Sequence, residues 1–333
     1  MSAITIDDEL VHYEVLGRGK PILLIHGWLG SWRYWVPTMQ QLAMKYRCYA
    51  LDLWGFGDTG KDPRRYDFDS QVNLIDRFIE RMGIPKVVII GHGLGALLGA
   101  RYAVLPESAP KVHKLLAVAP PLIDMAPPAG SYTGDDLDDD ELPHAAMTIP
   151  NRKALGDLAA RQQQWAAQQN NDVAIPSPAP NTAKQPHGNN VRTNVLHELF
   201  RDNPLDSLLN RAINPESVDF DKLLGEISKA HPPAIYASVE NYINTSAAPD
   251  LMRTKAPLCV VLGDEDELMP RPEESVLQKI SDRDQTKLLV MSETRHFPML
   301  EDKSQFARLL RDFLEATDVS ILEMKDEWRR RKR

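Results

Sequence analysis

The chain has 333 residues, so we expect a core of about 200 residues with an insertion or a second lobe. Hydrophobic residues make up 43% and charged residues 26% of the chain, which is typical of a soluble globular protein and excludes wholesale disorder. The formal net charge of −8 argues against a nucleic-acid partner, because such binding relies on Lys and Arg side chains that neutralise phosphates.

The N-terminal residues and the cysteines indicate the compartment. No basic segment followed by an apolar stretch stands at the start of the chain, and nowhere do about eighteen apolar residues run together. We therefore expect a cytoplasmic protein. Cys48 and Cys259 each lie in an apolar, strand-like run, where free cysteine behaves as a small buried hydrophobe, so no disulfide is expected.

Short apolar runs alternate with helical patterns, which predicts βαβ units and a mainly parallel sheet. The expected strands are 4–6, 10–15, 21–27, 48–53, 86–91, 114–120, 257–263 and 287–293. The expected helices are 31–45, 69–82, 94–104, 273–280 and 303–314. The strands from 21 to 120 are apolar on both faces, so we place them at the centre of an eight-stranded sheet flanked by helices.

A long insertion interrupts this alternation after residue 122. Residues 125–190 contain an acidic cluster, Gln- and Asn-rich stretches and repeated prolines, a composition that favours mobility because it cannot bury enough apolar surface. Helical periodicity returns over 191–251 and predicts a helical lid. The predicted organisation is an α/β core at 1–122 and 255–318, an inserted lid at 123–254 and a basic C-terminal tail at 319–333.

Four motifs follow the ends of predicted strands. His26 and Gly27 end the third strand, and a D-x-x-G-x-G pattern over 52–57 follows the fourth. The sequence GHGLG at 91–95, centred on Gly93, joins the fifth strand to a helix. Asp266 follows the seventh strand and His296 follows the eighth.

In this order the motifs resemble those of the α/β-hydrolase family over residues 3–122 and 255–316. The resemblance implies that 91–95 is the nucleophile elbow, that Asp266 is the acid and that His296 is the catalytic histidine. It also implies an oxyanion hole at the His26-Gly27 loop, formed by the backbone N–H groups of Trp28 and Leu94.

Other polar residues near these motifs are expected to have structural roles. We expect His26 and His92 to be packing histidines, Asp264 to be a solvated loop charge and the 52–57 loop to support the site. Asp124 is a less favoured substitute for the acid.

The centre of the elbow is Gly93, where the family carries a nucleophilic serine. Without a hydroxyl no acyl-enzyme forms, and ordinary esterase activity is not expected. Cys48 and Cys259 cannot replace it, because both are predicted within strands. Glycine also relieves the backbone strain of the elbow, which costs another residue about 1–3 kcal/mol.

We therefore interpret the chain as a pseudohydrolase that binds a small, partly apolar carbonyl or ester-like ligand, without a cofactor or a metal. One alternative is an enzyme in which His296 and Asp266 form a general-base dyad for hydrolase, lyase or cofactor-independent oxygenase chemistry without a covalent intermediate. Another is an inactivated variant of a carboxylic-ester hydrolase. The sequence does not indicate an oligomeric state.

The C-terminus ends in five basic residues, 329–333, after apolar Ile321, Leu322 and Trp328. Contact with anionic lipid is one interpretation of this cluster. We favour a solvated tail, because acidic residues lie beside the cluster and stable membrane attachment takes two signals.

Overall fold

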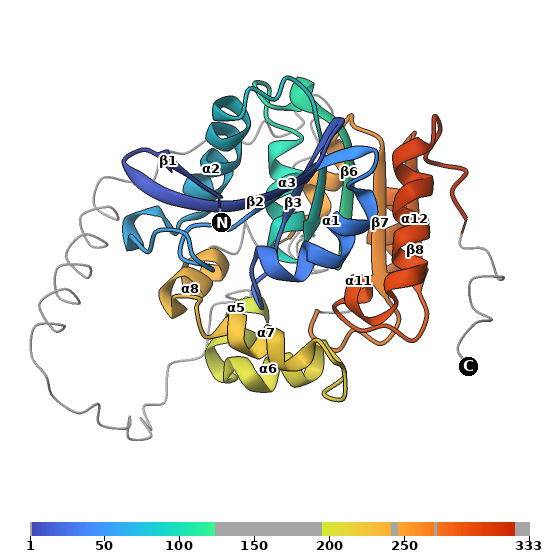
Figure 1. Ribbon diagram of the computed structural model, residues 1–333. Coiled ribbons are helices and arrows are strands. Elements are labelled where there is room, and N and C mark those ends of the chain that lie inside the picture. Colours follow the sequence, from blue (N-terminus) through green and yellow to red (C-terminus); the bar gives the residue numbers. More distant parts are fainter. Residues whose placement is uncertain (1, 124–194, 241–245, 270–271, 324–333) are drawn as a thin grey trace, which may run out of the picture. The chain divides into compact units, whose positions relative to one another are not determined.

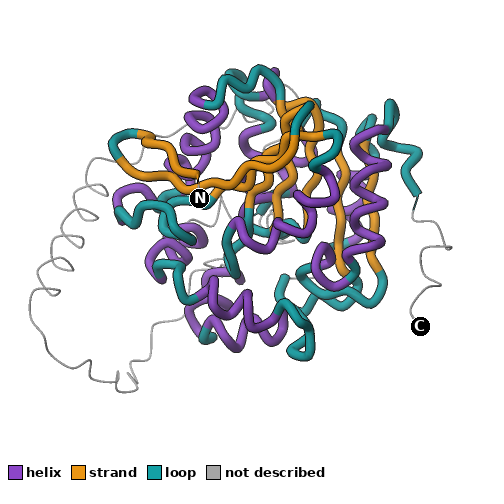
Figure 2. Tube along the Cα trace, in the orientation of Figure 1, coloured by secondary structure: helices purple, strands orange, loops and turns teal. Residues whose placement is uncertain are grey.

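The computed structural model describes residues 2–123, 195–240, 246–269 and 272–323. Eight strands form one sheet in the order β1-β2-β4-β3-β5-β6-β7-β8, as Figures 1 and 2 show. Their bounds are β1 Ser2–Ile6, β2 Glu9–Gly17, β3 Lys20–Ile25, β4 Tyr46–Leu51, β5 Val87–His92, β6 Val112–Val118, β7 Leu258–Gly263 and β8 Thr286–Met291. The β1–β2 and β2–β4 pairs are antiparallel and the other pairs are parallel, so the predicted α/β class with a mainly parallel eight-stranded sheet is confirmed.

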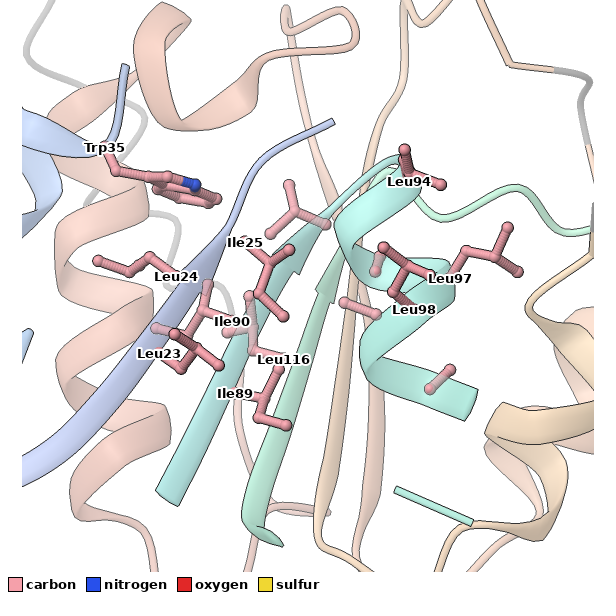
Figure 3. Close-up of a cluster of buried hydrophobic side chains, with 14 of the residues drawn as sticks. Leu23, Leu24, Ile25, Trp35, Ile89, Ile90, Leu94, Leu97, Leu98 and Leu116 are labelled. Carbon is pink, nitrogen blue, oxygen red and sulfur yellow. The ribbon is translucent and has the colours of Figure 1, made fainter. Parts of the chain in front are cut away.

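The central strands are buried on both faces because helices cover both. In Figure 3, Leu97 and Leu98 lie on one side of β3, β5 and β6, while Trp35 lies on the other. Ile25, Ile90 and Leu116 are completely buried between these layers. Continuous apolar runs therefore identified the sheet centre correctly. Cys48 in β4 and Cys259 in β7 are free and buried, as predicted.

The five predicted core helices are all present, with one difference at the start of the first, whereas the short helices η2, η3, α9 and α11 were not predicted as core helices. Their bounds are η1 Trp32–Trp35, α1 Val36–Leu42, η2 Pro63–Arg65, α2 Phe68–Arg81, α3 Leu94–Tyr102, η3 Ala109–Lys111, α9 Ala248–Arg253, α10 Glu274–Ser281, α11 Pro298–Glu301 and α12 Lys303–Glu315. The predicted helix 31–45 begins as a 3₁₀ turn, which Ser31 caps through its Oγ, and becomes α-helical at Val36. Pro37 suits that first α-helical turn, where its missing N–H leaves no bond unmade. The helix α1 contacts α12, whereas α3 contacts α2 and α9.

Between β6 and β7 the described residues also include four helices ahead of α9: α5 Val195–Asp202, α6 Leu205–Ala212, α7 Phe220–Ile227 and α8 Pro232–Glu240. They belong to the same compact unit as the sheet. The backbone N–H of His231 donates to the Gly55 carbonyl (2.7 Å), and the N–H of His296 donates to the Ala212 carbonyl (2.9 Å). These helices therefore contact loops at the carboxyl ends of the strands.

The action of α5–α8 as a lid and the domain boundaries stay predictions. The segment 125–190, Asp124 and the basic cluster 329–333 lie outside the described residues. None of the described helices has both the length and the apolar character needed to cross a bilayer.

Candidate active site

Gly93 forms the sharp turn between β5 and α3, with φ 51° and ψ −111°. Its N–H donates to the Val118 carbonyl (2.9 Å), and its carbonyl accepts from Ala96 and Leu97 in the first turn of α3 (3.1 Å each). The positive φ is one that residues with a side chain adopt only under strain. Glycine at the centre of the elbow, residues 91–95, is therefore in an unstrained conformation.

The flanking glycines of the elbow are required by close packing. A Cβ on Gly95 would overlap the Ile25 carbonyl of β3, and a Cβ on Gly91 would overlap the Gly95 carbonyl. These two contacts bring the start of α3 directly against the sheet.

His296 and Asp266 form a buried pair in the loops after β8 and β7. The imidazole Nδ1 lies 2.9 Å from Asp266 Oδ2, while Oδ1 accepts from the N–H groups of Leu268 (2.9 Å) and Met269 (3.2 Å). Since a carboxylate only accepts, Nδ1 carries the proton and Nε2 presents a lone pair. Nε2 has no hydrogen-bond partner among the described residues.

Two opposing effects set the pKa of Asp266. Burial raises it, but the positive charge that His296 can carry and the hydrogen bonds from His296, Met269 and Leu268 together outweigh burial. The pKa of this carboxyl therefore lies below its ordinary value, and the group is ionised at neutral pH.

The pair faces the centre of the elbow. A Cβ built on Gly93 would lie 3.4 Å from His296 Nε2 and 3.4 Å from Cε3 of the Trp28 indole. Both distances are ordinary van der Waals contacts. The structure thus brings together Gly93, His296 and Asp266 and leaves room for a small side chain at position 93.

The predicted oxyanion residues adjoin this space. The backbone N–H groups of Trp28 and Leu94 donate no hydrogen bond to another described residue. Leu94 is the first residue of α3, where the helix dipole favours negative charge. The Trp28 indole is anchored from the inserted helices, because its Nε1 donates to Ser238 Oγ (2.8 Å) and its ring lies 5.5 Å from that of Phe200.

His26 and His92 are both completely buried and both neutral. Burial lowers the pKa of each. The Nδ1 of His26 donates to the Gly27 carbonyl (2.8 Å), and its Nε2 accepts from the Leu53 N–H (3.0 Å), which ties together the loops after β3 and β4. The Nε2 of His92 donates to the carbonyl of His296 (2.9 Å).

Tyr34 connects His92 to the predicted oxyanion loop. Its hydroxyl accepts from the Gly27 N–H (2.7 Å) and donates to His92 Nδ1 (2.9 Å). Tyr34 and Ser238 were not predicted from the sequence. Tyr34 lies only seven residues after Gly27, and this short separation is a weak indication that its hydroxyl could reach the loop. Ser238 lies 210 residues from Trp28, so nothing in the sequence indicates their contact.

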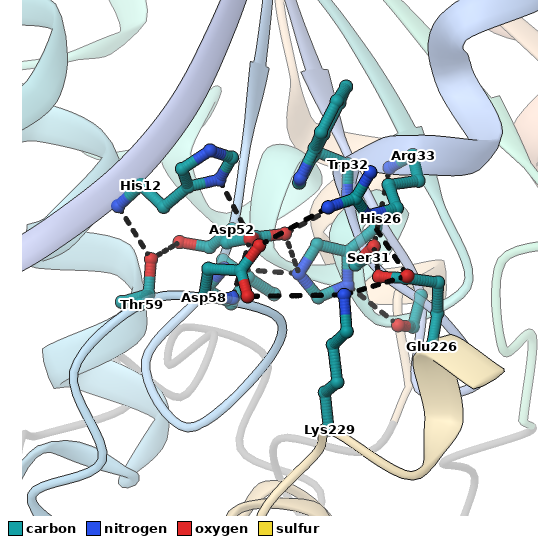
Figure 4. A network of polar contacts seen from close by, with 12 residues as sticks. His12, His26, Ser31, Trp32, Arg33, Asp52, Asp58, Thr59, Glu226 and Lys229 are labelled. Atoms are coloured by element: carbon teal, nitrogen blue, oxygen red, sulfur yellow. Dashed lines mark hydrogen bonds and ion pairs between the residues drawn. The ribbon is translucent and has the colours of Figure 1, made fainter. Parts of the chain in front are cut away.

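The 52–57 loop supports the site through Asp52, as Figure 4 shows. Its carboxylate accepts from the N–H groups of Trp32 (2.9 Å) and Asp58 (3.0 Å) and from His12 Nδ1 (3.1 Å). His12, Asp52 and Asp58 could each offer one atom to a metal ion, with these atoms within 4.8 Å of one another. Asp52 already accepts the hydrogen bonds just described, and the carboxylate of Asp58 pairs with Arg33 (3.7 Å) and Lys229 (3.9 Å). Asp264 is exposed, in agreement with its prediction as a loop charge.

Comparisons with known proteins agree with the observed fold. A family model described as alpha/beta hydrolase fold matches residues 20–303. Over 93 residues the chain is 32% identical to the soluble epoxide hydrolase of Corynebacterium sp. (strain C12), covering 28% of this chain and 32% of that protein. Over 112 residues it is 35% identical to human epoxide hydrolase 4, covering 32% and 30%. The chain thus matches about a third of the length of these relatives.

Solved structures of other proteins share this fold. A putative aryl esterase from Burkholderia cenocepacia superposes with a TM-score of 0.62 at 20% identity, covering 94% of this chain and 97% of that one. Taken with the sheet order and the matching family model, this shows that the chain belongs to the α/β-hydrolase fold family.

Proposed function

We propose that this protein is a pseudohydrolase that binds a small, partly apolar carbonyl or ester-like ligand at Gly93. The observation that carries the proposal is the space beside His296 Nε2, where a Cβ on residue 93 would fit at 3.4 Å but no nucleophile is present. The proposed partner is a small molecule and not a nucleic acid.

Covalent ester hydrolysis has no nucleophile here. Loss of the serine costs serine hydrolases about a million-fold in turnover. The cysteines lie within strands, and burial raises the pKa of both thiols to about 12, so neither supplies a thiolate.

Ligand binding is supported by the groups that remain. The free N–H groups of Trp28 and Leu94 suit a carbonyl oxygen, and the indole of Trp28 offers an apolar surface beside Gly93. The names of the relatives, epoxide hydrolase and aryl esterase, point to ligands with an electrophilic carbon bound to oxygen.

Gly93→Ser tests the proposal, with hydrolysis of p-nitrophenyl acetate as the readout. We expect a burst of p-nitrophenol with Gly93→Ser and none with the wild type, because the new Oγ lies within reach of His296 Nε2. The controls are Gly93→Ala and the double variant Gly93→Ser/His296→Ala, neither of which should show a burst. Wild-type turnover that depends on His296 would refute the pseudohydrolase. Recovery to the rate of an ordinary esterase would favour an inactivated carboxylic-ester hydrolase.

The second candidate is a non-covalent enzyme in which His296 acts as general base. It is supported by the unpartnered Nε2 and by the ionised Asp266 that orients the ring. Screening the wild type for hydrolysis, lyase and cofactor-free oxygenase reactions tests it. Any activity found must disappear in His296→Ala and fall strongly in Asp266→Asn. Activity that survives His296→Ala would exclude the dyad.

A further inference from the structure

Three polar groups around Gly93 make no hydrogen bond to any other part of the chain that the structure describes. They are the Nε2 atom of His296 and the backbone N–H groups of Trp28 and Leu94. All three residues are buried, with at most 1% of their surface exposed. Buried polar groups are nearly always hydrogen-bonded, so these groups indicate what a ligand at this site has to offer.

Other polar groups beside the site are already used. The Gly27 N–H donates to the Tyr34 hydroxyl (2.7 Å). His92 uses both ring nitrogens, Nδ1 with the Tyr34 hydroxyl (2.9 Å) and Nε2 with the carbonyl of His296 (2.9 Å). Among these described groups, the ones left for a ligand at Gly93 are therefore two donors and one acceptor.

The acceptor is fixed by Asp266. Its ionised carboxylate lies 2.9 Å from Nδ1 of His296, which keeps the ring proton on Nδ1 and leaves a lone pair on Nε2. A ketone or an ester has only oxygen acceptors, which suit the two N–H groups but leave Nε2 without a partner. An unpartnered buried acceptor costs binding free energy. A ligand that carries an O–H as well as a carbonyl satisfies all three groups.

The missing side chain of Gly93 leaves a place for this hydroxyl. A Cβ on residue 93 would lie 3.4 Å from His296 Nε2 and 3.4 Å from Cε3 of the Trp28 indole, both of them ordinary contacts. An oxygen slightly closer to Nε2 would be at hydrogen-bond distance, about 3 Å. Leu94 follows Gly93 directly, and the Trp28 ring borders the same space, so a carbonyl that accepts from their N–H groups must stand close to the hydroxyl.

We propose that the ligand at Gly93 is an α-hydroxycarbonyl compound. Its hydroxyl donates to His296 Nε2 in the space of the missing side chain, its carbonyl oxygen accepts from the N–H groups of Trp28 and Leu94, and its apolar part lies against the Trp28 indole. This inference rests on the proposed function, because it concerns the same site. It narrows the carbonyl ligand to one that also donates a hydrogen bond.

Isothermal titration calorimetry of the full chain with α-hydroxyacetophenone tests the proposal. The comparison ligands are acetophenone, which lacks the hydroxyl, and α-methoxyacetophenone, which has the oxygen but no proton to donate. We expect saturable binding of one α-hydroxyacetophenone per chain, about tenfold tighter than that of either comparison ligand, because only its O–H supplies a partner for Nε2.

Variants locate the hydrogen bond. The preference for α-hydroxyacetophenone should disappear in His296→Ala. It should also fall in Gly93→Ala, because the new methyl group takes the place of the ligand hydroxyl. The matched controls are His113→Ala, which changes an exposed histidine in β6, and Gly225→Ala, where a Cβ meets nothing within 4 Å. Both controls should keep the full preference.

Three outcomes would overturn the proposal. The first is equal binding of acetophenone and α-hydroxyacetophenone, weakened for both by Gly93→Ala, which would leave the carbonyl site of the proposed function standing. The second is a preference that survives His296→Ala, because the hydroxyl then binds elsewhere. The third is absence of saturable binding by all three ligands at millimolar concentration, in which case the burst assay with Gly93→Ser still decides the proposed function independently.

Discussion

The candidate active site has two halves, the His296–Asp266 pair and the elbow at residues 91–95, and different interactions fix their positions. The His296–Asp266 pair is held by side-chain contacts and by two N–H donors to Asp266, and the geometry of a proton-accepting histidine is complete. The elbow is held by backbone packing, in which Gly91 and Gly95 let α3 approach the sheet. Its central residue contributes only backbone hydrogen bonds.

This difference teaches that the elbow geometry does not require a side chain at its centre. The close approach of α3 to β3 and β5 buries Leu97 and Leu98, so the fold needs it whether or not residue 93 reacts. The elbow therefore keeps its shape without a nucleophile. The Nε2 of His296, which makes no hydrogen bond to another described residue, is not part of this packing, and it is the group on which the proposed function depends.

The largest effect is expected from breaking the packing of the elbow. Gly95→Ala places a Cβ against the Ile25 carbonyl, so we expect a loss of more than about 3 kcal/mol in the free energy of unfolding, or failure to fold. Gly225→Ala is the matched control, because a Cβ there meets nothing within 4 Å in the helix α7. It should stabilise the protein by about 0.5–1 kcal/mol. Urea unfolding measures both variants, and equal stabilities would contradict the packing argument.

A smaller loss of stability is expected from breaking the His296–Asp266 pair. Asp266→Asn removes a buried charge that pairs with His296, and we expect a loss of about 1–3 kcal/mol near neutral pH. The pKa of Asp266 is lower in the folded state, so its stabilisation is complete above the unfolded pKa, about 3.9, and is lost as the pH falls through the folded value.

The stability difference between the wild type and Asp266→Asn should therefore shrink as the pH falls below about 4. Chemical unfolding between neutral and acid pH follows this difference. A constant difference down to the lowest pH at which the protein stays folded would mean that Asp266 does not hold the pair through its charge.

The smallest effect is expected at the centre of the elbow. Gly93→Ala meets only ordinary contacts, so its cost is the backbone strain of a positive φ, about 1–2 kcal/mol. A loss as large as that of Gly95→Ala would mean that no room for a side chain exists at position 93. That result would also remove the basis for the Gly93→Ser experiment.

Much of the fold could be predicted from local patterns. Apolar runs bounded by turns identified the strands, and recurring apolar positions identified the core helices, because strand and helix periods are properties of short segments. The order of Gly93, Asp266 and His296 along the chain indicated the family, and it also indicated which residues would meet at the carboxyl ends of the strands.

The sequence by itself determined the strand pattern and the missing hydroxyl at Gly93, and the family resemblance implied the pairing of His296 with Asp266. Only the tertiary structure decided that Tyr34 joins Gly27 to His92 and that Ser238 anchors Trp28. These contacts join residues from different elements. The inserted helices contain no sequence motif that would indicate which residues they contact. Such contacts depend on how the helices pack on the sheet, and no local periodicity records that packing.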